Sequence, residues 1–281
     1  MLEFENVSFV YGQNTPFEKT AVDNVSIKIK PGTVTGINGH TGSGKSTLSQ
    51  MMNALLKPTS GRILLDGKDI WQKDFDTRSV RFRVGLVFQY PEYQLFEETV
   101  ERDIAFGPKN MGLSDEDIKE RVLYAAHFTG IPDEMLSKSP FELSGGQKRR
   151  VAIAGVIAMD PEILVLDEPA AGLDPKGKSD ILGRLCDFRK KRDNTLVIIS
   201  HSMEDIALYS DEIITLAGGK VLATGSPREV FAKHDLLTQN GLNIPQVTEI
   251  LARLKSDGYE VDDSAYTVEQ AATAIKKAFY F

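Results

Sequence analysis

The segment GHTGSGKS, residues 39–46, follows the phosphate-binding pattern G-x-x-x-x-G-K-[ST]. Its glycines let backbone N–H groups curve around phosphate oxygens, and the helix expected after the loop points its positive end at the anion. Lys45 is expected to reach the β- and γ-phosphates of a nucleotide, and Ser46 to offer its hydroxyl to Mg²⁺. An ordinary glycine turn explains the flanking apolar strand and helix less well. The candidate nucleotide-binding residues here are Gly39, His40, Thr41, Gly42, Ser43, Gly44, Lys45, Ser46 and Thr47.

Two carboxylates end an apolar strand farther along the chain. This segment, ILVLDE, covers residues 163–168 and ends in Asp167 and Glu168. Ligands of an open parallel sheet sit beyond the carboxyl ends of its strands, so these side chains are expected near the Lys45 loop. Asp167 is then expected to hold Mg²⁺ through water, and Glu168 to act as a general base or to orient the water that attacks the γ-phosphate. A helix N-cap at the strand exit explains one carboxylate well and two poorly.

Polar side chains also end two further apolar strands. The segment LVIISH ends in His201, and VGLVFQ ends in Gln89. A single histidine at a strand end is more often structural, but beside the other strand ends His201 is expected to contact the γ-phosphate. Four polar groups are thus predicted at one edge of the sheet: Ser46, Gln89, Glu168 and His201.

The elements that position these groups follow from hydrophobic patterns. Alternating segments near the N-terminus, FENVSFVY and AVDNVSIKIKPG, predict half-buried strands. The segments ILVLDEP and TLVIISH are continuously apolar, which is typical of central parallel strands buried on both faces. A helix is expected from Leu48 to Leu56, and EIITL with KVLATG predicts a hairpin. The predicted fold class is α/β: a phosphate-loop nucleotide-binding domain with a mainly parallel core sheet, an antiparallel β subdomain, an inserted helical subdomain at about 91–160 and a small helical C-terminal extension.

The domain boundary is expected near residue 230, with one domain over 1–230 and a helical extension over 231–281. An apolar stripe predicts the first helix of the extension: Val247, Ile250, Leu251 and Leu254. Thr267 and Gln270 predict a capping box for the second helix. The apolar face of that helix is expected to hold Val268, Ala271, Ala272, Ile275 and Phe279. Packing is the default role of both helices.

Composition excludes several classes of protein. The single cysteine, Cys186, permits no internal disulfide and favours a reducing compartment. The longest apolar run, 151–159, is too short to cross a bilayer, which takes about 20 residues. No signal peptide is evident at the N-terminus. A net charge of −7 argues against non-specific nucleic-acid binding, so no nucleic-acid partner is expected.

A further motif, LSGGQ at residues 143–147, resembles the signature of ATP-binding cassette (ABC) ATPases. It precedes an expected helix, whose start presents a hydroxyl and N–H groups to a phosphate. In this family that phosphate belongs to ATP on the opposite subunit, so the resemblance implies a head-to-tail dimer with two ATP molecules between the subunits. The residues implied to bind the partner's ATP are Ser144, Gly145, Gly146 and Gln147.

Other family elements occur in the same order along the chain. Tyr11 resembles the aromatic residue that stacks on adenine, with a strand-edge tyrosine as the alternative. Gln89 matches the glutamine that contacts Mg²⁺ and the attacking water. The loop AGLD, residues 171–174, matches the loop that crosses to the partner's site, and the chain reads DEPAAGLD where the family often has DEPTAGLD. The resemblance covers residues 1–230 and implies ATP and Mg²⁺ as ligands.

Within the family, the chain is most similar to the ATPases of energy-coupling factor (ECF) transporters, and among these to the second, A-prime type. The resemblance is carried by TPFEKTAVDNVS, FQYPEYQLFEETVERDIAFGP and FELSGGQKRRVAIAGVIAMDPEILVLDEP. It implies a heterodimer with the sister ATPase, docked on a membrane T subunit. A separate S subunit captures a vitamin or a transition metal ion. The implied location is the cytoplasmic face of the cell membrane, as a peripheral subunit.

The aromatic stretch Tyr90–Phe96 is expected to dock on the T subunit, with Glu92, Glu97 and Glu98 pairing with basic residues there. Packing in the seam between the sheet and the helical subdomain is an equal alternative for Leu95 and Phe96. Other functions remain as alternatives: a soluble cassette ATPase acting on ribosomes or DNA, the ATPase of another ABC importer, or an assembly subunit that does not hydrolyse ATP. Intact Glu168 and His201 argue against the last of these.

Overall fold

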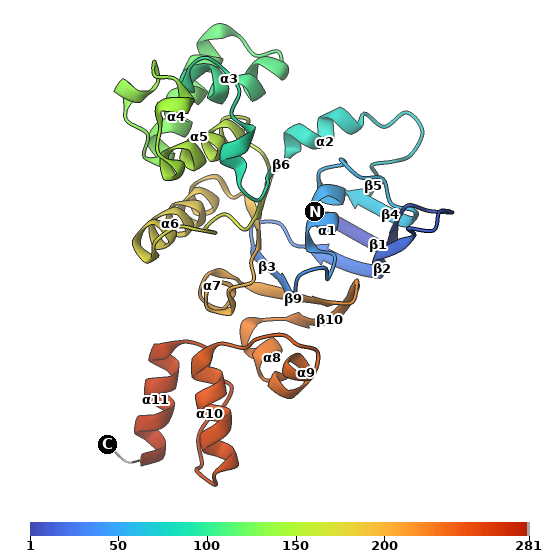
Figure 1. Ribbon diagram of the computed structural model, residues 1–281, viewed down its shortest axis with the longest axis vertical. Helices are drawn as coiled ribbons and strands as arrows, with labels where there is room; N and C mark the ends of the chain where they lie inside the picture. Colours follow the sequence, from blue (N-terminus) through green and yellow to red (C-terminus); the bar gives the residue numbers. More distant parts are fainter. Residues whose placement is uncertain (280–281) are drawn as a thin grey trace.

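The computed structural model describes residues 1–279, apart from the side chains of residues 191 and 192. Within this part of the chain, the core is a six-stranded sheet in the order β10-β9-β3-β8-β7-β6 (Figure 1). All of its pairings are parallel except that of β10 with β9, which confirms a mainly parallel core sheet and the predicted hairpin. The strands are β3 (Val34–Gly39), β6 (Val84–Val87), β7 (Ile163–Asp167), β8 (Thr195–Ile199), β9 (Glu212–Ala217) and β10 (Lys220–Gly225).

A second, antiparallel sheet stands beside the core sheet, in the order β2-β1-β4-β5. Its strands are β1 (Leu2–Tyr11), β2 (Lys19–Ile29), β4 (Ser60–Leu65) and β5 (Lys68–Asp69). Helix α1 (Lys45–Met52) packs in one apolar cluster with both sheets. This helix is shorter than predicted, because Ala54 takes a left-handed conformation with φ of 55° and the chain turns before Leu56.

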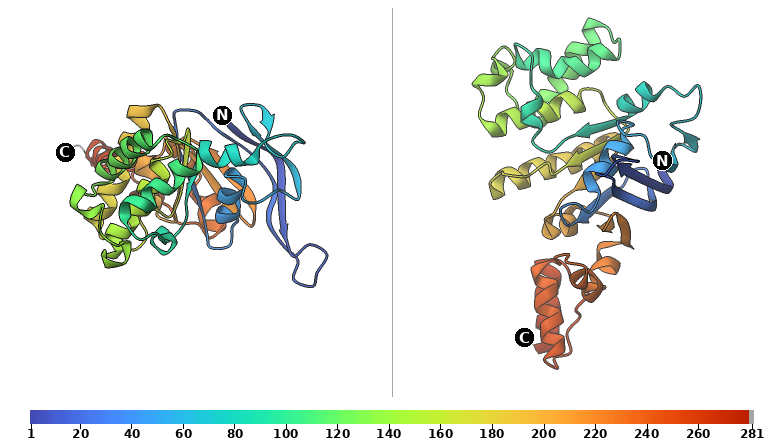
Figure 2. Two further views of the ribbon diagram at one scale, coloured as in Figure 1. Left: turned by 90° about the horizontal axis from the view of Figure 1, so that it is seen from above. Right: turned by 45° about the vertical axis from the view of Figure 1, so that its right-hand side comes forward.

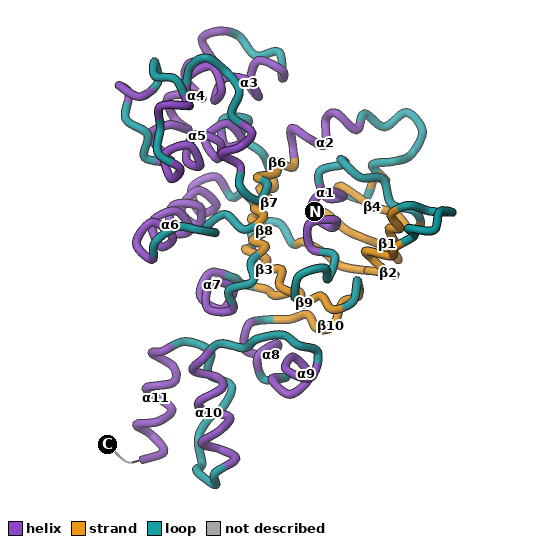
Figure 3. The backbone as a smooth tube through the Cα atoms, viewed as in Figure 1, coloured by secondary structure: helices purple, strands orange, loops and turns teal. Residues whose placement is uncertain are grey.

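Alternating side chains of the core strands enter two different apolar clusters. On β7, Leu164 and Leu166 pack with α6 (Pro175–Arg192), whereas Ile163 and Val165 pack with α1. Helices therefore cover the sheet on both faces, as Figure 3 shows. This explains why β7 and β8 are continuously apolar rather than alternating.

The predicted helical insertion is a group of helices at one end of the molecule (Figures 1 and 2). Its elements are the 3₁₀ turn Pro91–Gln94, α3 (Val100–Asn110), α4 (Asp115–Thr129), two further 3₁₀ turns at Asp133–Met135 and Pro140–Glu142, and α5 (Gly145–Ile157). Helix α2 (Thr77–Arg83) leads into β6, and α7 (Met203–Tyr209) follows β8.

The C-terminal extension lies at the opposite end of the molecule (Figure 2). It contains α8 (Pro227–Phe231), α9 (His234–Gln239), α10 (Gln246–Ser256) and α11 (Val268–Phe279). The last two helices enclose a small cluster of their own around Leu251 and Ala271. Two predictions for this region are wrong in detail. Ile250, Val268 and Ala272 are exposed. The capping box is half formed: Thr267 accepts the N–H of Gln270, but the Gln270 side chain accepts the N–H of Tyr266 rather than that of Thr267. Among residues 1–279, no helix has the length and apolar character needed to span a bilayer.

Candidate active site

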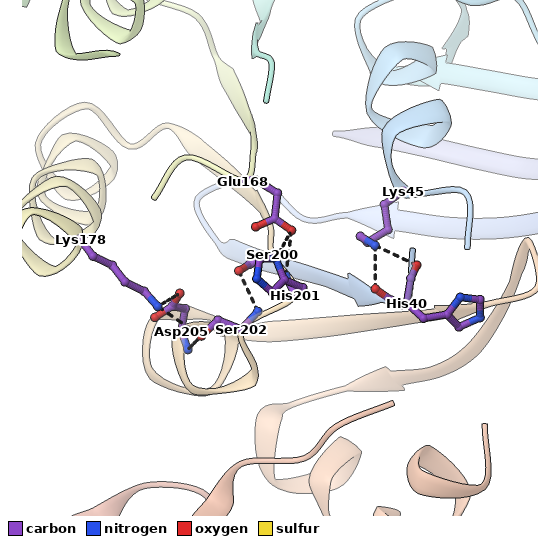
Figure 4. Close-up of polar contacts among 9 residues, drawn as sticks. His40, Lys45, Glu168, Lys178, Ser200, His201, Ser202 and Asp205 are labelled. Carbon is purple, nitrogen blue, oxygen red and sulfur yellow. Dashed lines mark hydrogen bonds and ion pairs between the residues drawn. The ribbon is translucent and has the colours of Figure 1, made fainter. Parts of the chain in front are cut away.

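The phosphate loop joins β3 to α1, as its sequence pattern predicts. Gly44 has φ of 102°, and a Cβ at this position would lie 2.4 Å from the carbonyl oxygen of Ala21, so only glycine fits. The Lys45 ammonium donates hydrogen bonds to the carbonyl oxygens of Gly39 at 2.6 Å and of His40 at 3.1 Å (Figure 4). Burial lowers the pKa of Lys45, and the carboxylates of Glu168 and Asp167 oppose this shift. The amine is thus held at the loop where a phosphate would offer it stronger acceptors.

Glu168 leaves β7 in a left-handed backbone conformation, with φ of 54°, that few non-glycine residues adopt. Its N–H donates to the carbonyl oxygen of Ile199 at 2.9 Å, which fixes the turn against β8. One oxygen, Oε1, accepts the backbone N–H of His201 at 2.9 Å and lies 2.8 Å from the Nδ1 atom of the same histidine. The carboxylate is buried, whereas three-quarters of the His201 side chain is exposed. His201 therefore orients Glu168 and still faces outward.

Asp167 lies at the end of β7 and is only 5% exposed. Burial raises the pKa of this carboxyl, while hydrogen bonds from the hydroxyls of Ser46 and Ser49 favour its charged form. Oxygen donors of this kind suit Mg²⁺, which usually takes one or two carboxylates together with substrate phosphates. Among the described residues, no three histidine, cysteine or acidic side chains gather into a metal site. The Asp167 carboxylate and the Ser46 hydroxyl are oxygen donors of the kind that fit Mg²⁺.

These groups line one cavity of about 670 Å³. Of the predicted site residues, it brings together Tyr11, Gly39, His40, Thr41, Gly42, Gly44, Lys45, Ser46, Thr47, Gln89, Asp167, Glu168 and His201. Ser43 is fully buried in the loop and does not line the cavity. The Tyr11 hydroxyl lies 3.2 Å from that of Thr47, which ties the tyrosine to the start of α1.

The cavity has lining residues that the sequence analysis missed: Lys19, Ala21, Met203, Gly241, Leu242 and Asn243. Lys19 pairs with Tyr11 across β1 and β2, so the register of that hairpin would have revealed it. The turn between α9 and α10 carries no motif and is 40 residues from His201 along the chain (241 − 201). Leu242 packs in the same apolar cluster as Met203, which brings this turn of the extension beside the site.

The LSGGQ residues lie elsewhere, at the start of α5, and none of them lines the cavity. Ser144 caps the helix: its Oγ accepts the N–H of Gln147, and the Gln147 side chain accepts the N–H of Ser144. A Cβ at Gly145 would meet no atom within 4 Å, and one at Gly146 only Leu173 at 4.0 Å. The chain's own packing does not require these two glycines.

Comparison with known proteins agrees with this arrangement. Residues 22–171 match the ABC transporter family. The energy-coupling factor transporter ATP-binding protein EcfA2 of Clostridium tetani is 52% identical over 279 residues, covering 99% of this chain and 97% of that protein. This chain belongs to the ABC transporter family. It is an ATPase of the energy-coupling factor group, and the EcfA2 protein of Caldanaerobacter subterraneus is similarly related, with 51% identity over 96% of this chain and 94% of its own length.

Solved structures support the same ABC fold. The structure of cbiO1 from Clostridium perfringens, part of the ABC transporter complex cbiONQ, has a TM-score of 0.75 and 39% identity, covering 92% of this chain and 96% of that one. A dimeric, post-hydrolysis structure of the ATP-binding cassette MJ0796 bound to ADP and Pi has a TM-score of 0.72 and 28% identity. The match covers 80% of this chain and 98% of that one.

The stretch after Gln89 differs from the prediction in one respect. Glu92 does not face outward, because it forms a two-pronged ion pair with Arg149 on α5, with Nε–Oε2 and Nη2–Oε1 distances of 3.1 and 2.9 Å. The two side chains are only 15% and 5% exposed. Arg149 also donates to the carbonyl oxygen of Ala171. In this ABC ATPase the pair therefore joins the Gln89 segment, the signature helix and the loop after Glu168.

A second cavity, of about 460 Å³, forms an apolar groove between the sheet and the helical insertion. Phe96 and Phe106 stand on it edge to face, 4.9 Å apart, and both are about half exposed. Asp103, also on the groove, accepts the N–H groups of Phe96 and Glu97, and burial raises the pKa of this carboxyl. Leu95 packs on the main core, as the seam alternative predicted, whereas Phe96 remains open to solvent.

Proposed function

We propose that this ABC ATPase powers a vitamin or transition-metal importer by closing and opening a heterodimer with the sister ATPase. The observation that carries the proposal is the separation of two halves of a site. The cavity holds the groups expected to bind and hydrolyse ATP, whereas the signature residues lie outside it and include two glycines that the chain's own packing does not need. A head-to-tail partner brings its own signature helix to this cavity and receives Ser144–Gln147 at its own.

Hydrolysis in this site follows from the positions of three side chains. Lys45 offsets the negative charge of the phosphates, and the N–H groups of the loop donate hydrogen bonds to them. Glu168 aligns the attacking water and accepts its proton. The water oxygen bonds to the γ-phosphorus as the bond to the β–γ bridging oxygen breaks, releasing ADP and phosphate. His201, in contact with Glu168, steadies the γ-phosphate. Ser46, Asp167 and Gln89 are the residues that would hold Mg²⁺, which offsets phosphate charge.

Glu168→Gln tests this assignment. The variant keeps the shape of the side chain but cannot accept the proton, so ATP binding is expected to persist while turnover falls at least about 100-fold. Turnover is measured by phosphate release from the purified transporter complex, and binding by calorimetry. Glu162→Gln is a matched control, because this glutamate lies just before β7, is exposed and pairs with Arg83. Near-normal turnover in Glu168→Gln would contradict the proposed role.

We propose the apolar groove as the docking site of the T subunit on the cytoplasmic face of the membrane, with the S subunit contacted only through it. An apolar helix fits a groove lined by Phe96 and Phe106, and the Asp103 carboxylate on its wall suits a basic residue. The groove adjoins the segment after Gln89, so a change at the nucleotide would reach it. Docking thereby makes this ATPase a peripheral membrane subunit.

Phe96→Ala tests docking by co-purification with the membrane subunits. The variant is expected to lose the membrane subunits and to keep ATP binding, since Phe96 is half exposed and lies away from the cavity. Phe17→Ala is the control, because Phe17 is 87% exposed and does not line the groove. Retention of the complex by Phe96→Ala would argue against the groove. Co-purification with ribosomes or DNA and never with a membrane subunit would restore the soluble alternative.

A further inference from the structure

His201 sits at the end of a short series of polar contacts that begins on α6. The Lys178 ammonium lies 2.7 Å from the Oδ2 atom of Asp205 and donates a longer hydrogen bond, of 3.4 Å, to the hydroxyl of Ser202 (Figure 4). Ser202 follows His201 directly and caps α7, accepting the N–H of Asp205. The backbone N–H of His201 in turn donates to Glu168. The hydrogen bond from Lys178 to Ser202, the peptide link from Ser202 to His201 and the hydrogen bond from the His201 N–H therefore connect α6 to the carboxylate proposed to align water.

The Lys178–Asp205 pair is partly withdrawn from solvent. The exposed fractions of its side chains are 32% and 12%. Both residues line a cavity of about 330 Å³, which is distinct from the groove and is also lined by Glu168 and His201. An ion pair in such a place is screened less than one on the open surface, and removing the cation leaves the Asp205 carboxylate poorly solvated. The loop carrying Ser202 then loses its link to α6.

Lys178 is placed to transmit movement of the loop that precedes α6. Asp174, the last residue of that loop, caps the helix through its side chain. The N–H of Lys178 donates to the carbonyl oxygen of Asp174 at 2.9 Å, so the two residues are held one turn apart. The loop residues Ala171 and Gly172 line the same cavity as the ion pair.

We propose that Lys178 and Asp205 form a positioning pair, which sets His201, and through it Glu168, according to the position of the 170–174 loop. This inference rests on the proposed roles of Glu168 and His201. Neither member of the pair lines the nucleotide cavity, so the pair acts on the chemical step and not on ATP binding. The rate of hydrolysis therefore depends on the position of the 170–174 loop.

The test compares steady-state ATPase activity of the assembled transporter carrying Lys178→Met, Asp205→Asn or both. Each single change is expected to lower kcat about tenfold, since small misplacements of catalytic groups have effects of that order or larger, and to leave KM and the ATP dissociation constant within about twofold. The double variant is expected to lose no more than the single ones, because both remove one interaction. Lys178→Arg, which keeps the cation, is expected to restore most of kcat.

Arg184→Met is the matched control. Arg184 lies on the same helix, is 40% exposed and pairs with Asp180, without a contact to the His201 loop. Its kcat is expected to be unchanged. A pair that only staples α6 to α7 would lower the unfolding temperature of Lys178→Met and Asp205→Asn and leave kcat of the folded complexes unchanged, which would overturn the inference. So would equal kcat losses in Lys178→Met and Lys178→Arg.

Glu168→Gln, measured alongside, separates the two proposals. If it abolishes turnover while Lys178→Met and Asp205→Asn do not lower kcat, the positioning pair is refuted and the catalytic assignment stands. If Glu168→Gln turns over normally, the catalytic assignment fails first, and the positioning pair fails with it.

Discussion

Glu92→Ala is expected to destabilise the free chain strongly, because it breaks a buried ion pair on one side only. The guanidinium of Arg149 is 5% exposed and bonds both oxygens of Glu92. Removing one partner of such a pair leaves an uncompensated buried charge and costs about 3–5 kcal/mol. The remaining contact of Arg149, with the carbonyl of Ala171, is a neutral acceptor and offsets little of this. At about 2 °C per kcal/mol for a chain of this size, the unfolding temperature is expected to fall by about 6–10 °C.

The measurement is unfolding of the purified chain by heat and by urea, followed by circular dichroism. Glu92→Gln retains one acceptor oxygen and is expected to lose only about 1–2 kcal/mol. Glu98→Ala is the control within the same segment: Glu98 is 80% exposed and pairs with Arg102 one helical turn away, so its removal is expected to change stability by less than about 0.5 kcal/mol. A loss below about 1 kcal/mol in Glu92→Ala would refute the view that Arg149 depends on this one carboxylate. It would also free Glu92 for the contact with the T subunit that the sequence alone predicts.

Three further outcomes are expected. Asp167→Asn should stabilise the nucleotide-free chain near pH 7 and abolish Mg²⁺-dependent turnover. Burial raises the pKa of Asp167, so its charge destabilises the fold once the pH rises through this raised pKa and does not do so in acid. The gain in unfolding temperature should therefore shrink toward pH 4, and the absence of a gain at pH 7 would contradict this prediction. Tyr11→Ala should weaken ATP binding about tenfold in calorimetry through loss of stacking, whereas Tyr11→Phe should bind normally; equal affinities for all three would remove Tyr11 from the adenine site. Leu251→Ala should lower the free energy of local unfolding of α10 and α11 by about 2–4 kcal/mol. Hydrogen exchange should become faster in these two helices and stay unchanged in β7 and β8. Faster exchange in both regions would contradict a separately packed extension.

Local sequence identified most of the candidate site because each of its parts is a short segment with its own pattern. A glycine loop before a helix, two carboxylates after a buried strand and a histidine after another are all visible without the fold, and the parallel order of the strands delivers them to one cavity. The contribution of Asn243 was not visible in this way, because the turn between α9 and α10 reaches the cavity only by the packing of Leu242 beside Met203.

The helices of the extension show the same division. Periodicity correctly predicted two amphipathic helices, but it did not distinguish Leu251, which is fully buried, from Ile250, which is 53% exposed. Neighbours on a helical stripe differ by about 100° in direction, and only the position of α11 decides which of them is covered.

The sequence by itself identified an ABC ATPase, with its phosphate loop, the residues expected to hold magnesium and to align water, and a signature whose glycines the chain's own packing does not require. Tertiary structure alone decided which charges are free to meet a partner. Glu92 was expected to meet a partner, and no pattern in the sequence singles out Arg149, Lys178 or Asp205, yet each of the four is paired across elements and partly or fully buried. The reason is physical: a charged residue that faces solvent and one that pairs in the interior can be of the same type. What distinguishes them is the neighbouring side chain, which comes from a distant part of the chain.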